Sequence, residues 1–425
     1  MRNEDQFQDR LPRANSFLAK AIHAFAAVLA LLVVPAQIAQ AQTYRVLYNF
    51  TGGQDGAFPE SLAMGRAGNL YGTASAGGSS GHGTVFKFST GSLTSLYSFA
   101  DSGYGDYPYP MHQIMVGRDG TLYGTAKYGG GSGTVFNLRP LATACKTALC
   151  PWTQTALYRF TGGTDGANPT GVPVFDGAGN IYGTTLYGGS GPCDYPPYGC
   201  GVVYKLTPSS GTWTESVPYS FNGSDGYYPS SGMIFDAAGD LYGTTMGGGD
   251  FGAGTVFTLA PSGSGWAYSA IHSFDYQKDE GYFPFGNLIS DHAGNLYGST
   301  GSGLSGGGTI FQLSPSDNGW IFSVLYSFTE TSPSLDYVSL TMDSAGNLYG
   351  TTYLVGAYGN GSVFKLSPGI GGWTYRSLHD FCSDGQTCSD GALPLGLVLD
   401  EAGNLYGTAL VGGAQSFGVI WEITP

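Results

Sequence analysis

The sequence predicts an all-β fold, a seven-bladed β-propeller with four antiparallel strands in each blade. A phrase of the type Gly-Asn-Leu-Tyr-Gly-Thr recurs seven times at intervals of 52 to 60 residues, and such self-similarity is typical of propellers and other repeat arrays. Each repeat holds four short strand candidates separated by turn residues, which is the content of one blade. Glycine accounts for 71 of the 425 residues and charged residues for only 11%, which favours short strands and tight turns over long helices.

The repeated phrase itself predicts a strand that is buried on both faces. Its first copy places Leu70 and Tyr71 on opposite sides of a strand, because successive side chains alternate. A sheet packed between two neighbouring sheets needs apolar residues on both sides. Gly72 follows at a position where we expect adjacent sheets to approach closely. The tyrosines of the seven copies are Tyr71, Tyr123, Tyr182, Tyr242, Tyr297, Tyr349 and Tyr406.

The other strand types predict the order of strands within a blade. An apolar strand that runs into Asp, as at Asp236, is predicted to be innermost. A Gly-Thr-Val-Phe strand and a Trp-to-Phe strand follow, and the latter is predicted to be outermost. Because Trp and Phe are eight residues apart, both are expected on one face. The five pairs are Trp152 and Phe160, Trp213 and Phe221, Trp266 and Phe274, Trp320 and Phe328, and Trp373 and Phe381.

The two ends of the predicted propeller complement each other. Residues 43–50, which begin at Thr43 and end at Phe50, form an outermost-type strand that precedes the first inner strand. Residues 418–423 form a Gly-Thr-Val-Phe-type strand, so the last blade lacks an outer strand. Pairing the two segments closes the ring and removes an exposed edge. We therefore expect residues 42–425 to form one propeller.

The N-terminal segment, residues 1–41, is typical of a signal peptide. Four basic residues precede an apolar run over residues 21–34, and Ala39-Gln40-Ala41 is a small-x-small cleavage site. The run is short for a membrane span, and the alternative is an uncleaved anchor. Cleavage after Ala41 leaves Gln42 first, with no further membrane span, and predicts a secreted, periplasmic or cell-surface protein.

The charge of the mature chain excludes two classes of partner. Removing residues 1–41 leaves 12 basic and 27 acidic residues, a formal net charge of −15. Such a surface repels nucleic acid and anionic lipid, so we expect neither as a partner. We expect a monomer.

Six cysteines agree with export. They lie in three close pairs, and near-neighbour pairing into disulfides is the simplest of the fifteen connectivities. The alternative is a metal site, for which the five scattered histidines of the mature chain offer little support. We predict no metal and no cofactor. The pairs are Cys145 and Cys150, Cys193 and Cys200, and Cys382 and Cys388.

The repeat resembles the GloVer (Gloeo-Verruco) tandem repeat of exported bacterial proteins. The resemblance rests on the Gly-Asn-Leu-Tyr-Gly-Thr phrase, the Gly188-Gly189 pair that follows one copy, and the Gly-Thr-Val-Phe segments, and it covers all seven units. It implies no particular activity. Kelch repeats are similar in the Gly-Gly pair and in the Trp before the outer strand, which would imply the same fold.

Two families of loops are predicted to share one face of the disc. One connects the second and third of the four strands in order from the centre. The other joins an outer strand to the next inner strand and repeats Asp-Gly-x-x-Pro, in which Asp caps its own turn and Pro sets the exit. We interpret these aspartates as structural, with a carboxylate ring for cations or sugars as the alternative. They are Asp55, Asp165, Asp225 and Asp390.

Tyrosines that break the repeat are the candidate ligand-binding residues. Aromatic faces near Asp and Asn suit sugar rings, which offer C–H surfaces and hydroxyls. The alternative is that these rings pack between blades. The candidates are Tyr104, Tyr107, Tyr109, Tyr195, Tyr198, Tyr227, Tyr228 and Tyr282.

Motifs for catalysis are weak, so we predict no catalytic residue. Known nucleophile, zinc and phosphate motifs are missing, and His82, His112 and His272 are candidate bases without an identified partner. We favour an exported, non-catalytic module that binds glycan or protein. The alternatives are a carbohydrate-active lyase or hydrolase that uses the central funnel, and a structural envelope protein.

Overall fold

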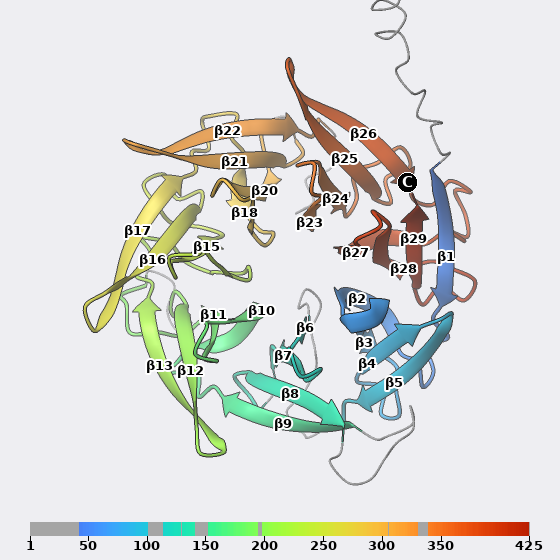
Figure 1. Cartoon of the computed structure of the whole chain (residues 1–425), viewed down its shortest axis with the longest axis horizontal. Coiled ribbons are helices and arrows are strands. Elements are labelled where there is room, and N and C mark those ends of the chain that lie inside the picture. The colour runs from blue at the N-terminus through green and yellow to red at the C-terminus, as the bar shows by residue number, and fades with distance from the viewer. Residues whose placement is uncertain are drawn as a thin grey trace, which may run out of the picture. The chain divides into compact units, whose positions relative to one another are not determined.

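Seven antiparallel sheets follow one another along the part of the chain that the structure describes (Figure 1). This computed structural model describes residues 42–100, 114–128, 130–140, 152–193, 198–304, 306–329 and 339–424. The predicted signal peptide lies outside them, and no helix of the described residues is long and apolar enough to cross a bilayer. Each sheet is one blade, which confirms the predicted seven-bladed propeller.

The first four blades each contain four strands, which follow one another from the centre of the ring outwards. Blade 1 comprises β2 (Ala57–Met64), β3 (Leu70–Ala76), β4 (Thr84–Ser89) and β5 (Ser92–Ser98), with the short 3-10 helix η1 (Arg66–Gly68) between β2 and β3. Blade 2 comprises β6 (Met115–Val116), β7 (Leu122–Ala126), β8 (Thr134–Pro140) and β9 (Trp152–Arg159). Blade 3 comprises β10 (Ala167–Phe175), β11 (Ile181–Tyr187), β12 (Val202–Ser209) and β13 (Thr212–Ser220). Blade 4 comprises β14 (Ile234–Phe235), β15 (Leu241–Thr245), β16 (Thr255–Ser262) and β17 (Gly265–Ser273).

The last three blades repeat this order with small variations. Blade 5 divides its inner strand into β18 (Tyr282–Pro284) and β19 (Ile289–Ser290), followed by β20 (Leu296–Ser302), β21 (Thr309–Ser316) and β22 (Gly319–Ser327). Blade 6 comprises β23 (Leu340–Met342), β24 (Leu348–Thr352), β25 (Ser362–Gly369) and β26 (Gly372–Asp380). Blade 7 comprises β27 (Ala392–Leu399), β28 (Leu405–Val411), β29 (Val419–Thr424) and, from the other end of the sequence, β1 (Thr43–Asn49).

The N-terminal strand closes the ring, as the sequence predicted. β1 pairs antiparallel with β29, from Thr43 opposite Thr424 to Asn49 opposite Val419. In Figure 1 the blue β1 lies beside the red β29, while β2 and β27 lie toward the centre. The last blade therefore takes its outer strand from the start of the propeller chain.

Among the described residues the hydrophobic core is divided into seven clusters, one between each pair of neighbouring blades. Between blades 1 and 2, for example, Val85 and Phe99 pack with Leu122 and Phe136. The two faces of the repeated strand contribute to different clusters. Leu70 packs between blades 7 and 1 and Tyr71 between blades 1 and 2, as expected for a sheet buried on both faces.

The glycine of the repeated phrase is required by its own sheet. A Cβ added to Gly72 would lie 2.5 Å from the ring of Phe86 on the adjacent strand β4 and 2.3 Å from the carbonyl oxygen of Ser61 on β2. The expected close approach of neighbouring sheets occurs at the inner strands instead, where a Cβ on Gly171 would lie 2.3 Å from the backbone nitrogen of Gly232. An aromatic ring that covers a strand glycine replaces the missing side-chain contact.

The prediction that Trp and Phe of an outer strand share one face is wrong. Trp213 packs between blades 2 and 3, whereas Phe221 packs between blades 3 and 4. The register of β12 with β13 shifts between Val203 and Lys205, which is a β-bulge. One extra residue in a strand reverses the alternation that follows it. The outer strand therefore contributes large side chains to both neighbouring clusters.

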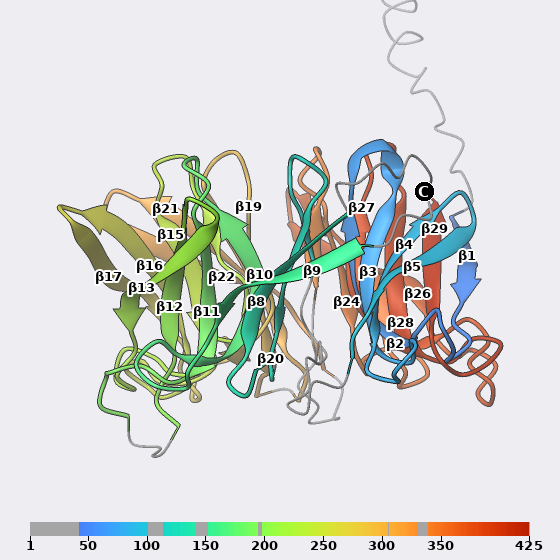
Figure 2. The same ribbon diagram turned by 90° about the horizontal axis from the view of Figure 1, so that it is seen from below.

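The two predicted loop families do share a face, which we call the loop face. The backbone N–H of Gly78, between β3 and β4, donates to the carbonyl oxygen of Gly53, before β2, at 2.7 Å. The same contact joins Gly189 to Gly163 at 3.0 Å. Figure 2 shows the connections between strands gathered at two opposite ends of the blades.

Candidate functional site

The Asp-Gly loops are built around carboxylates that accept several hydrogen bonds. Asp55 accepts from the backbone N–H of Thr51 at 2.8 Å and from the hydroxyl of Tyr48 at 3.0 Å. Burial and the Asp55 carboxylate together raise the pKa of Tyr48 to about 12, so this hydroxyl remains a donor. Asp165 holds the same arrangement with Thr161 and Tyr158. These carboxylates are occupied in fixing their own loops to the outer strand.

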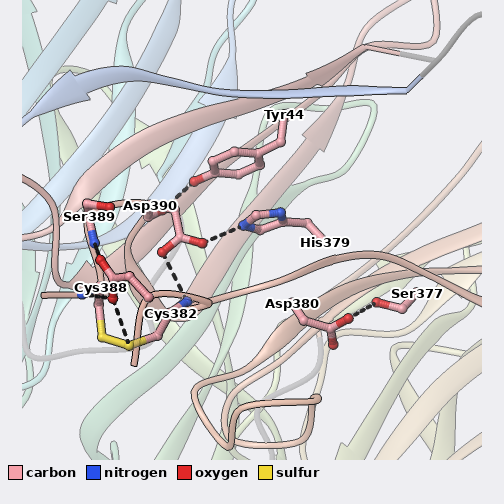
Figure 3. Close-up of polar contacts among 9 residues, drawn as sticks. Tyr44, Ser377, His379, Asp380, Cys382, Cys388, Ser389 and Asp390 are labelled. Atoms are coloured by element: carbon pink, nitrogen blue, oxygen red, sulfur yellow. Dashed lines mark hydrogen bonds and ion pairs between the residues drawn. A yellow bond between two sulfur atoms is a disulfide. The ribbon is translucent and has the colours of Figure 1, made fainter. Parts of the chain in front are cut away.

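The loop that leads from blade 6 into blade 7 has the same arrangement, with histidine in place of tyrosine (Figure 3). Asp390 accepts from the backbone N–H of Cys382 at 3.0 Å and lies 2.9 Å from Nε2 of His379. Tyr44 of β1 stacks on the His379 ring with 3.7 Å between centroids and donates to the carbonyl oxygen of Asp390. The closing strand and the loop face are thus directly linked.

Blade 5 supplies a partner for His272 that the sequence did not reveal. Nε2 of His272 lies 3.0 Å from Glu280, in the loop between β17 and β18, which takes the place of an Asp-Gly loop. Burial lowers the pKa of His272, against the opposing effect of Glu280. The ring also stacks on Phe322 at 4.0 Å, so this histidine serves a packing interface. His112 lies outside the described residues.

Two of the predicted disulfides are formed. Cys193 bonds Cys200 and Cys382 bonds Cys388, while Cys145 and Cys150 lie outside the described residues. Asp384 lies close to the second disulfide, but bonded sulfurs are not available as thiolate ligands for a metal. Disulfides persist in oxidising compartments, which indicates an extracytoplasmic protein.

Half of the candidate ligand-binding tyrosines lie in described segments, where they form two clusters. Tyr104, Tyr107, Tyr109 and Tyr195 lie outside the described residues. Tyr198 and Tyr228 both contact the ring of Tyr187, with centroids at 5.4 and 5.3 Å, and Tyr227 packs on Tyr228 at 4.9 Å. Tyr198 is 61% exposed, while the other candidates of this cluster are partly buried. Only the outer ring of this cluster is freely presented to solvent.

Tyr282 belongs to a second cluster, on blades 4 and 5. Its ring contacts Tyr276 at 5.0 Å and Phe283 at 5.1 Å. Nearby, the ammonium of Lys278 lies 5.6 Å from the ring of Phe251. Tyr276 and Phe251 are exposed, whereas Tyr282 is partly buried. The exposed rings of this cluster are therefore not those of the candidate tyrosine.

The loop face carries most of the exposed large apolar side chains of the described residues. One such side chain lies in each connection between the second and third strands of blades 2 to 7, and Tyr276 lies in an Asp-Gly-type loop. Ile370 lies on the opposite face, and Ile321 and Val324 lie on β22. The six residues of these connections, which we call the rim residues, are Tyr128, Tyr198, Phe251, Leu304, Tyr358 and Phe417. The sequence feature that could have indicated these residues is the apolar residue beside each of these Gly-rich connections.

A cavity of about 450 Å³ lies among the innermost strands at the centre of the ring. Its lining is mostly apolar and includes Met233, Leu288, Leu340 and Leu397. It also includes Glu60 of β2, which is 4% exposed and has no hydrogen-bond partner for either carboxyl oxygen. None of these residues could be predicted, because nothing in the sequence marks which side chains meet across the centre.

A comparison with known proteins identifies the family of the repeat. A family model described as the Gloeobacter/Verrucomicrobia repeat matches residues 36–193, 147–341 and 305–425. This match confirms the resemblance expected from the sequence. No curated protein matches the chain.

Solved structures are similar in fold at low sequence identity. The extracellular domain of a one-component system from B. thetaiotaomicron aligns over 89% of this chain with a TM-score of 0.54 and 11% identity, and this chain spans 39% of that one. A Thermus thermophilus protein described as an oxidoreductase (glucose dehydrogenase) aligns over 90% of this chain and 100% of its own, at 15% identity and a TM-score of 0.44. A Trichoderma reesei carbohydrate-active enzyme of family AA12 aligns over 91% and 96%, at 13% identity and a TM-score of 0.44. These likenesses concern the fold alone.

Proposed function

This chain belongs to the Gloeobacter/Verrucomicrobia repeat family, and we propose that it is an exported, non-catalytic module that binds neutral glycans on its loop face. Export is supported by the N-terminal pattern of residues 1–41 and by the two disulfides. The observation that carries the proposal is the rim, where exposed apolar side chains recur in loops around one face.

The chemistry of the rim suits sugar rings. Exposed Tyr and Phe side chains offer flat apolar surfaces, and polar groups lie beside them: the amide of Asn360 donates to the carbonyl oxygen of Tyr358 at 3.0 Å, and Lys278 lies over Phe251. Several weak sites on one face of a rigid ring engage a repeating polymer together, which raises the overall affinity. A formal net charge of −14 for the whole chain favours neutral polymers over anionic ones.

The test is affinity electrophoresis of the purified protein in gels that contain neutral polysaccharides. Replacing Phe251 or Tyr276 by Ala removes one exposed ring, worth about 0.5–1.5 kcal/mol, so binding is expected to weaken by about twofold to tenfold. Ile321→Ala and Ile370→Ala are matched controls, because these side chains are also exposed but lie off the loop face. Equal losses for all four variants would contradict the proposal, as would retardation in no gel.

A further inference from the structure

Glu60 is the residue of the central cavity that departs most from the repeat. It follows Pro59 of β2, and the residues at the same place after the loop proline in four other blades are Thr170, Ser230, Phe285 and Leu395. The register of β2 with β3 shifts between Pro59 and Ser61, so Glu60 lies in a β-bulge. Bulges redirect a side chain and are common beside functional sites.

The carboxyl of Glu60 is buried at a high energetic cost. The side chain is 4% exposed and neither oxygen has a hydrogen-bond partner. Burial raises the pKa of Glu60 well above its ordinary value, against a smaller opposing effect of the nearby Ser75 hydroxyl, which donates to the carbonyl oxygen of Phe58 at 3.4 Å. An unsatisfied buried carboxyl is rare unless it serves a ligand or a reaction.

The rest of the cavity defines which ligand would satisfy this carboxyl. Among the described lining residues, Glu60 is the only ionisable one, and apolar side chains predominate. Outside the lining, the phenol of Tyr353 is close enough to interact with Glu60, which adds to the effect of burial in raising the pKa of Tyr353. The polar exceptions are few and include Ser230, whose hydroxyl is also buried without a partner. We propose that the central cavity binds an organic monocation, an ammonium group on an apolar body, with the ammonium paired to Glu60.

Two other ligand classes fit the described lining less well. A calcium ion takes six to eight oxygen ligands, commonly from several carboxylates, and this lining supplies one carboxylate. A sugar needs hydrogen-bond partners for most of its hydroxyls, and the lining is mainly Leu, Ile, Val and Met. An apolar ammonium needs one carboxylate and an apolar wall, which is what these residues provide.

Binding would change the protonation of Glu60. In the free protein the Glu60 carboxyl keeps its proton to a higher pH than an ordinary glutamate does. An ammonium that binds beside it stabilises the carboxylate, so the proton passes to solvent. Affinity for the ammonium is then expected to rise by about tenfold per pH unit until the pH reaches the pKa of Glu60 in the free protein. A neutral ligand that accepts a hydrogen bond from the protonated carboxyl would show no such rise.

The experiment is isothermal titration calorimetry of the full protein with phenethylammonium, and with phenethyl alcohol as the uncharged probe of similar shape. We expect phenethylammonium to bind with release of a proton, seen as a dependence of the heat on the buffer, and to bind more tightly than the alcohol. Glu60→Gln is expected to weaken ammonium binding at least about tenfold and to abolish proton release. Glu401→Gln, which changes an exposed carboxylate in the turn between β27 and β28, is the matched control and should change neither.

A folding control separates loss of the site from loss of the structure. Because the folded pKa of Glu60 lies above its ordinary value of 4.5, the folded protein retains a proton that the unfolded chain releases as the pH rises through this window. As the pH rises above 4.5, the stability of the wild type should therefore fall relative to that of Glu60→Gln. The melting temperature of the variant should be at least as high as that of the wild type. A second variant, Thr341→Trp, fills part of the cavity, keeps Glu60 and should weaken both probes.

Three outcomes would overturn the inference. These are undiminished ammonium binding by Glu60→Gln, binding of the alcohol as tightly as the ammonium, and binding of neither probe. Displacement of the ammonium by calcium chloride at low concentration would also overturn it in favour of a metal site. The rim residues take no part in this site, so its failure leaves the glycan proposal untouched, and the reverse holds.

Discussion

In five outer strands, the tyrosine or histidine two positions before the phenylalanine contacts a carboxylate of the loop that follows. Tyr219 donates to Asp225 at 2.5 Å, and its ring stacks on Tyr268 of the following outer strand at 4.5 Å. Tyr326 stacks in the same way on Tyr375 at 4.4 Å. One side chain thus fixes a loop by a hydrogen bond and a blade interface by stacking. These hydrogen bonds tie the recurring loop aspartates to the outer strands.

Glu215 is an exception at the position that Tyr268 and Tyr375 occupy. All three residues lie two positions after an outer-strand tryptophan. Burial, with the neighbouring Asp165 carboxylate as a smaller cause, raises the pKa of Glu215 to about 7, and one of its carboxyl oxygens is buried without a partner. A carboxyl therefore replaces the expected ring at the interface of blades 2 and 3.

Glu215→Tyr is accordingly expected to stabilise the protein. The new ring can stack on Tyr158, which is worth about 1 kcal/mol beyond the area it buries. Removing the carboxyl adds a pH-dependent part, because wild-type stability falls as the pH rises from the ordinary 4.5 of Glu215 to about 7. Water screens this half-buried group, so we expect that part to be on the order of 1 kcal/mol. Urea unfolding across this pH range measures both.

Gln154→Tyr is the matched control for Glu215→Tyr. Gln154 lies two positions after Trp152 and carries no charge, so the substitution adds a ring without removing a carboxyl. Its gain in stability should not vary over the same pH range. If the gain of Glu215→Tyr were equally independent of pH, the carboxyl would have no unfavourable effect at this interface.

At the scale of elements, the strands could be predicted from the sequence and the side-chain directions only in part. The repeated phrase and its turn residues located the four strands of a blade and their order. The extra residue of the bulge that separates Trp213 from Phe221 lies in β13, between Ser216 and Tyr219. It was not predictable, because the corresponding extra residues of other outer strands, such as Leu325 and Leu378, are ordinary apolar residues. The same limit applies to Glu60, whose bulge directs it to the centre.

The loops show a second limit of the sequence. Long insertions drew attention to Tyr198, while short Gly-rich loops such as that of Phe251 looked uniform. The two kinds of loop residue differ in solvent exposure, which depends on how each ring packs on its neighbours. Tyr228 is covered by Tyr187 and Tyr227, whereas Phe251 is not enclosed. The rim could be recognised only once the loops were placed on one face.

The disulfide loop between β11 and β12 is predicted to position Tyr198 for binding. The variant pairs Cys193→Ser with Cys200→Ala, since Cys200 is buried. Opening so short a loop should cost about 2–3 kcal/mol. Glycan binding should weaken as well, because Tyr198 loses its fixed position on Tyr187. Thermal unfolding and affinity electrophoresis measure the two effects separately.

The control for this variant is Cys382→Ala with Cys388→Ala. The two disulfides span similar separations, seven and six residues, so both variants should lose similar stability. Only the loss of the first should weaken glycan binding through Tyr198. Unchanged binding after loss of Cys193 and Cys200 would show that Tyr198 does not need the disulfide for its role.

Closure of the ring was predictable from the sequence, because the count of strands left one blade incomplete. The chain has one outer strand before its first inner strand, and its last blade lacks an outer strand. In a closed ring, the first strand can only fill that place. The contents of the central cavity were not predictable in the same way, since they depend on residues from six blades that meet only when the ring is closed. The repeat therefore determines the fold, but it does not determine which side chains line the central cavity.

Ring closure by β1 makes a prediction for a chain that starts at residue 51. Such a chain lacks the stack of Tyr44 on His379, the ion pair of Arg45 with the buried Glu422, and the partner of the β29 edge. An unpaired edge strand recruits other chains, so we expect aggregation or dimerisation and a melting temperature lower by about 10 °C or more.

A synthetic peptide of residues 42–50 should restore the monomer and raise the melting temperature, because strand addition replaces β1. A peptide of the same composition in scrambled order should not. A truncated chain that stays monomeric and melts with the full protein would show that the remaining strands hold the ring closed without β1.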